Sequence, residues 1–81
     1  MHSALRLVRE RLPLLREHAG QLFEEDDIFR ELCEEYEVCV DTAARIEGAE
    51  KVNRALLDEY LALRMRLEGE LLRYMAEHWK K

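Results

Sequence analysis

Apolar residues recur at helical spacing in three stretches of the chain, so the sequence predicts an all-α protein. The pattern predicts helices over residues 4–18, 26–47 and 53–78. Ser3 is positioned to cap the first helix, and Gly20 is a natural stop after it. Pro13 should kink or break this helix, because a proline in a helix interior removes a hydrogen bond and clashes with the preceding turn.

The two longer helices are predicted to form an antiparallel hairpin. Asp26 or Asp27 can cap the first of them, and Gly48 follows its last periodic residue. Only residues 48–52 separate the two patterns, and such a short link forces antiparallel neighbours. The seam between the helices is predicted from residues at alternating steps of three and four, as in a coiled coil. The predicted hairpin core is Phe29, Leu32, Tyr36, Cys39, Ile46, Leu56, Tyr60, Leu63 and Leu67.

The last helix carries more apolar surface than one neighbouring helix can cover. A second apolar row lies beside its core row. This second row is Leu57, Leu61, Leu72, Met75 and Trp79. Either the N-terminal helix covers the row, or another subunit does. We favour the second alternative, so the row is the predicted interface and the hairpins are expected to form a dimer or a higher helical bundle.

Length and charge narrow the possible functions. The 81 residues form one predicted domain, residues 1–81, whose core is too small to be more than marginally stable alone. The net charge is −5, and residues 17–50 hold twelve acids against two arginines. Such an acidic middle argues against nucleic acid as the main partner. No apolar run is long enough to span a bilayer, and no secretory signal is recognisable. We therefore expect a cytoplasmic protein with reduced thiols.

The sequence holds no recognisable catalytic, cofactor or metal motif. Cys33 and Cys39 are six residues apart, so their side chains diverge on a helix and cannot share a metal. No histidine has another histidine or a cysteine at ligand spacing, and the glycines are isolated. The glutamates of the middle helix are interpreted as a solvated face. We therefore predict no enzyme, no cofactor and no metal.

These observations favour a non-enzymatic, self-associating helical module for protein–protein interactions, which would act as a cytoplasmic scaffold or adaptor. Its helical faces are also candidates for binding another protein. The alternative hypothesis is a metal or small-ligand site between subunits around Glu70, Glu77 and His78. Glu70 takes a place that a strict heptad would give to an apolar residue, and it can pair with a nearby arginine or fix the register of an oligomer. Attachment of the basic segment 4–16 to a membrane surface is a weaker alternative, since Pro13 interrupts it.

Residues 13–76 resemble the YdcH-like family of small bacterial proteins, a domain of unknown function. The residues that carry the resemblance are Leu22-Phe23, Phe29, Leu32, Tyr36, Asp41, Ile46-Glu47-Gly48, Leu56, Tyr60-Leu61, Leu63 and Leu67. The resemblance implies a helical hairpin with a short leading helix and self-association. It implies no activity. The chain departs from the family at Tyr36, where a histidine or asparagine is usual, and in lacking a lysine-rich start to its last helix.

Overall fold

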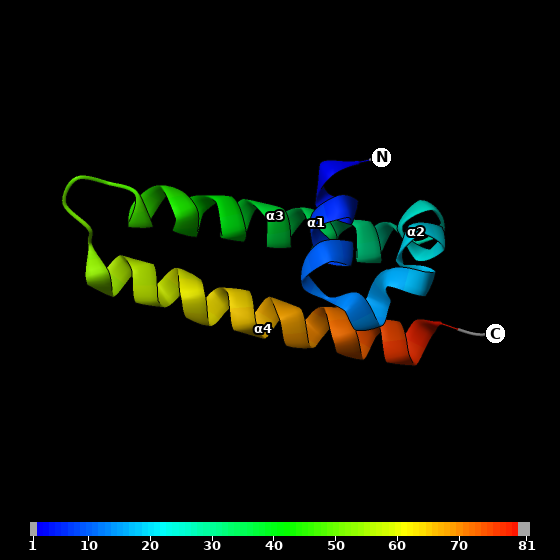
Figure 1. Ribbon diagram of the computed structural model, residues 1–81. Coiled ribbons are helices and arrows are strands. Elements are labelled where there is room, and N and C mark those ends of the chain that lie inside the picture. The colour runs from blue at the N-terminus through cyan, green and yellow to red at the C-terminus, as the bar shows by residue number, and fades with distance from the viewer. Residues whose placement is uncertain (1, 80–81) are drawn as a thin grey trace.

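The computed structural model describes residues 2–79, and over these residues the chain is all-α, as predicted (Figure 1). The elements are α1 (Ser3–Arg11), a 3₁₀ turn η1 (Pro13–Leu15), α2 (Arg16–Glu25), α3 (Asp27–Glu47) and α4 (Arg54–His78). None of the helices in this part of the chain is long and apolar enough to cross a membrane.

Helices α3 and α4 form the antiparallel hairpin that the sequence predicted, in a molecule 48 Å long (Figure 1). Side chains cap both helices at their N-termini. Asp26 Oδ1 accepts a hydrogen bond from the Phe29 amide at 3.0 Å, and Asn53 Oδ1 accepts one from the Leu56 amide at 3.1 Å. These local caps explain why both helices begin within one residue of the predicted positions.

The N-terminal region differs from the predicted single helix over residues 4–18. Helix α1 ends at Arg11, and Leu12 after it has a non-helical backbone (φ −126°, ψ 75°), because the residue before a proline is pushed out of the helical region. Helix α2 then runs through Gly20 to Glu25, so the predicted stop at Gly20 is wrong. The cap of α1 is His2, whose Nδ1 accepts from the Ala4 amide at 3.1 Å, in place of the predicted Ser3.

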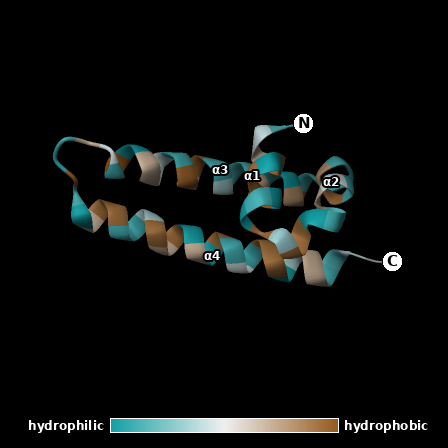
Figure 2. Ribbon diagram, viewed as in Figure 1, coloured by the Kyte–Doolittle hydropathy of each residue, from teal (hydrophilic) through white to brown (hydrophobic). Residues whose placement is uncertain are grey.

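The core lies where α1 and α2 pack on the hairpin. Helices α1 and α2 cover the N-terminal part of α3, and η1 between them contacts α4, while the other end of the hairpin is only two helices thick (Figures 1 and 2). The largest fully buried side chains are all in this region: Tyr36, Phe29, Leu71, Val8, Cys33 and Cys39. The packed core is therefore confined to one end of an elongated molecule.

Most of the predicted hairpin core is at least partly buried. Phe29, Tyr36, Cys39 and Leu67 are buried, and the half-buried residues are Leu32, Ile46, Tyr60 and Leu63. Leu56 is the exception, since it is 37% exposed while the next residue, Leu57, is buried. One residue is a 100° step around a helix, so the buried stripe of α4 begins one position later than predicted.

Candidate functional site

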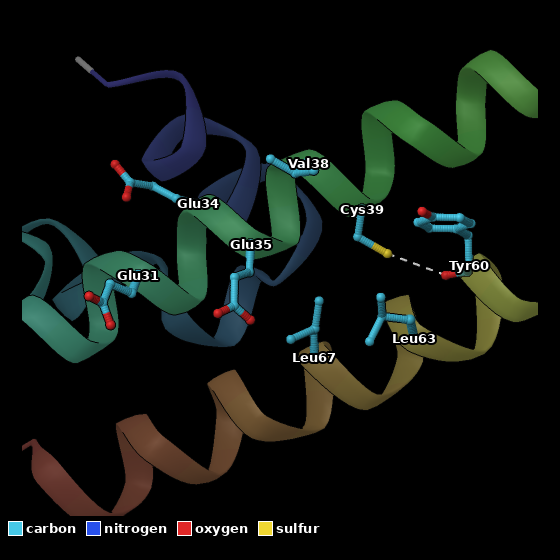
Figure 3. A pocket seen from close by; sticks show the side chains of 8 residues that line it. All are labelled: Glu31, Glu34, Glu35, Val38, Cys39, Tyr60, Leu63 and Leu67. Atoms are coloured by element: carbon cyan, nitrogen blue, oxygen red, sulfur yellow. Dashed lines mark hydrogen bonds between the residues drawn. The ribbon is translucent and has the colours of Figure 1, made fainter.

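An open groove of about 690 Å³ runs between α3 and α4 (Figure 3). None of the residues that line the groove belongs to α1 or α2. Helix α4 supplies an apolar wall, and α3 supplies three acids and an exposed valine. The lining residues are Glu31, Glu34, Glu35, Val38, Cys39, Tyr60, Leu63 and Leu67.

The floor of the groove is apolar, and a hydrogen bond between its two helices holds it together. The Cys39 thiol donates a hydrogen bond to the Tyr60 carbonyl at 3.3 Å, which joins α3 to α4 at one end of the groove (Figure 3). Burial raises the pKa of the Cys39 thiol, so the group is neutral at physiological pH. Leu67 is buried, and Leu63 and Tyr60 are half-buried. The floor is therefore apolar and uncharged.

The rim of the groove is acidic. Among the described residues, no cationic side chain forms a salt bridge with Glu31 or Glu35. Glu34 lies 3.5 Å from His2 Nε2, a contact that is an ion pair only when the imidazole is protonated. The arginine nearest in sequence, Arg30, is directed elsewhere, with a 2.7 Å salt bridge to Asp27. The groove thus combines an apolar floor with uncompensated negative charge.

Val38 is the most exposed apolar residue of the groove. It is 62% exposed, although β-branched residues of this size are usually buried in a packed helix. It lies on the face of α3 that the sequence assigned to solvated glutamates. The sequence carries one signal of this site, because Val38 is an apolar residue in the middle of that acidic face.

Two hydrogen bonds between side chains hold the helices that form the walls. The Tyr36 hydroxyl donates to Glu68 Oε2 at 2.6 Å, and burial, together with this carboxylate, raises the pKa of Tyr36. The Tyr74 hydroxyl donates to the capping residue Asp26, at 2.7 Å from Oδ2. This hydrogen bond is the first cause that raises the pKa of Tyr74 to about 12, because ionisation would remove the proton that Asp26 accepts; burial and the charge of Asp26 add to it.

The predicted interface row needs correction, because the subunit itself covers part of it. Leu57 and Met75 are buried, and the ring of Trp79 is half-buried and stacks on His18 of α2 at 4.0 Å. Leu61 is half-buried, and Leu72 is 36% exposed. Packing of the N-terminal segments against the C-terminal end of α4 thus removes part of the row from the surface. The same packing buries the apolar side of α1 that a membrane surface would have needed.

The residues of the alternative metal site do not converge within one subunit. His78 stacks on Tyr74 with ring centroids 3.8 Å apart, and its Nδ1 lies 3.1 Å from the Tyr74 carbonyl oxygen. Glu70 is half-buried, and Glu77 is exposed. Within residues 2–79, no three histidines, cysteines, aspartates or glutamates are grouped so that they could hold a metal ion.

Comparisons with family models, curated proteins and solved structures gave no match for this chain. The resemblance to the YdcH-like family therefore stays a prediction. The chemistry of the groove itself, an apolar floor beside an acidic rim, is therefore the basis for its interpretation.

Proposed function

We propose that this protein is a non-enzymatic, self-associating interaction module that acts in the cytoplasm as a scaffold or adaptor. The observation that carries the proposal is the groove between α3 and α4, with Val38 exposed above an apolar floor. A concave apolar strip between two helices is a common docking surface for helical segments. One exposed apolar residue, Val38, and two half-buried ones, Tyr60 and Leu63, lie together there, and apolar surface gathered at one site is typical of interaction surfaces.

The size and shape of the subunit support the same proposal. A domain of about 80 residues has little stability to spare, and here the packed core occupies only one end of the molecule. The remainder of the hairpin is two helices thick, so each helix has a face that no other element covers (Figure 1). Association through the groove would cover part of this surface and add stability to the assembly. Both cysteines are free and buried, in keeping with a reducing compartment.

The test is a comparison of two substitutions in α3 that differ in position but hardly in exposure. Val38→Glu places a charge on the rim of the groove. Ile28→Glu places the same charge on a β-branched residue of the same helix that is 58% exposed and lies outside the groove. The molar mass in solution is measured by sedimentation equilibrium from low to high micromolar concentration.

We expect the wild-type protein and Ile28→Glu to associate, and Val38→Glu to remain monomeric. A glutamate on the apolar part of the interface would be buried without a partner, which is costly. A wild-type protein that is monomeric over the whole range would refute the proposal. Equal association of both variants would also refute it, since the groove would then not be the contact surface.

A further inference from the structure

We infer that the groove binds the η1 corner of a second copy of this chain, with Leu14 inserted between the groove walls and Arg11 and Arg16 facing the acidic rim. This inference rests on the proposed self-association and specifies the partner segment. The corner is defined here as residues 11–16. It is apolar at its tip and basic at both sides, and the groove is apolar at its floor and acidic at its rim.

Leu14 is exposed because of the local backbone. Pro13 begins the 3₁₀ turn, and Leu15 closes it with a hydrogen bond from its amide to the Leu12 carbonyl at 2.9 Å. Leu15 is buried in the core, so its neighbour Leu14 is directed away from it and is 86% exposed. This is the most exposed of the large apolar side chains in residues 2–79. A leucine on a proline-containing turn is also held rigidly, which lowers the entropy that binding would cost.

The charges of the corner match those of the groove. Arg11 and Arg16 are exposed, and neither forms a salt bridge with a residue that the structure describes. Glu31 and Glu35 on the rim are also without such partners. Bringing the two surfaces together would pair opposite charges around an apolar contact, an arrangement that favours both specificity and fast association.

The same charges disfavour the simplest alternative, a two-fold dimer in which two grooves face each other. A two-fold interface brings the same surface patch of both subunits together. Here it would place the acids of one rim against the acids of the other, and like charges across an interface are destabilising. A contact between different surfaces of two copies avoids this repulsion.

A contact of corner to groove has a consequence for the assembly. Each copy that uses its corner still offers a groove, and each copy that uses its groove still offers a corner. Such heterologous contacts produce rings if they close and linear chains if they do not. The wild-type protein should therefore form either a closed ring, of which the reciprocal dimer is the smallest, or an open chain. Association should weaken with added salt because exposed charges contribute to it.

The decisive experiment mixes two variants that each lack one half of the contact. Leu14→Glu removes the corner and keeps the groove, and Val38→Glu removes the groove and keeps the corner. Met65→Glu is the matched control for Leu14→Glu, because Met65 is 69% exposed and lies outside the groove. The molar masses of each variant and of the equimolar mixture are measured by sedimentation equilibrium.

We expect each of the two variants alone to associate at least about tenfold more weakly than the wild type, while Met65→Glu associates normally. The mixture should form a complex of one Leu14→Glu chain with one Val38→Glu chain, and no larger species. One intact corner and one intact groove permit a single contact, which cannot be extended. Formation of this complex would also show that both variants are folded.

Other results would overturn the inference in distinguishable ways. If Leu14→Glu associates like the wild type while Val38→Glu does not, another segment occupies the groove, and the proposed function stands without the inference. The same conclusion applies if both variants are monomeric but their mixture does not associate, because the corner and the groove then do not bind each other. If the wild-type protein is monomeric, both the inference and the proposed function fail.

Discussion

The hydrogen bond from Tyr36 to Glu68 offers the sharpest test of how the hairpin is held together. The side chain of Tyr36 is fully buried, and its hydroxyl donates to Glu68 Oε2 at 2.6 Å. Replacing Tyr36 with phenylalanine keeps the ring and its packing and removes only the hydroxyl. The substitution therefore measures the contribution of one hydrogen bond between α3 and α4.

The expected loss can be worked from the surroundings of the two groups. A hydrogen bond to a charged partner contributes about 1.5–3 kcal/mol to stability. The side chain of Glu68 is 30% exposed, so water can replace the lost hydroxyl in part, and the lower end of this range applies. We expect Tyr36→Phe to lower the free energy of unfolding by about 1.5 kcal/mol. For a domain of this size such a loss corresponds to a decrease in Tm of roughly 6–12 °C.

The assay is urea unfolding followed by circular dichroism, with all chains carrying Val38→Glu so that self-association does not contribute to stability. The matched control is Tyr60→Phe, because the Tyr60 side chain is half-buried and its hydroxyl forms no hydrogen bond within residues 2–79. We expect the control to change the free energy of unfolding by less than about 0.5 kcal/mol. Equal losses in the two variants would refute the reasoning, since the hydroxyl of Tyr36 would then have no special role.

The pH dependence gives an independent check. Burial is the first cause that raises the pKa of Tyr36, and hydrogen bonding to Glu68 is the second. A raised pKa means that the folded state holds the proton more tightly than the unfolded state. The stabilisation is therefore complete below the ordinary tyrosine pKa of 10.0 and is lost as the pH rises above it. The difference between Tyr36→Phe and its parent should shrink in alkaline solution, and a difference that grows there would contradict the assigned hydrogen bond.

Three further predictions concern single residues. The pKa of Asp26 is lowered mainly by the hydrogen bond from the Phe29 amide and next by the one from the Tyr74 hydroxyl. The free energy of unfolding should therefore fall as the pH drops below about 4, where Asp26 becomes protonated. Urea unfolding of Asp26→Asn should lack this acid dependence. Gly20→Ala should raise the free energy of unfolding by up to about 1 kcal/mol in the same assay, since a Cβ at this helical position meets nothing within 4 Å. A decrease in the free energy of unfolding would instead show that α2 is strained at this position. Burial raises the pKa of Cys33 to about 12, so a thiol reagent should label it far more slowly in the native protein than in urea, and rapid native labelling would contradict the packing.

The sequence was sufficient to predict the hairpin because its signals are local and agree with one another. Periodic apolar residues define α3 and α4, and the caps Asp26 and Asn53 lie directly before them. The N-terminal region was harder, because Gly20 gives a local stop signal that tertiary packing overrides. Burial of Leu22 and Phe23 against the core keeps α2 helical through this glycine.

The candidate site could not be predicted from periodicity alone. A wide apolar stripe on the last helix shows that more than one neighbour covers it, but not whether that neighbour is the same chain. The structure answers this for Met75 and Trp79, which the subunit covers itself. The groove was missed because, apart from Cys39, its α3 side consists of residues off the apolar stripe, on the face where the glutamates were interpreted as solvated.

The exposure of Leu14 and Val38 is what makes the proposed association separable from folding. A side chain that is largely exposed contributes little to the stability of its own subunit, so replacing either residue should leave the free energy of unfolding of the monomer nearly unchanged. Leu71 and Met75 lack this property, because they are buried and their replacement would disturb the core together with any interface. An effect of Leu14→Glu or Val38→Glu on association can thus be assigned to the contact itself, and that assignment depends on the way Pro13 turns Leu14 away from the core.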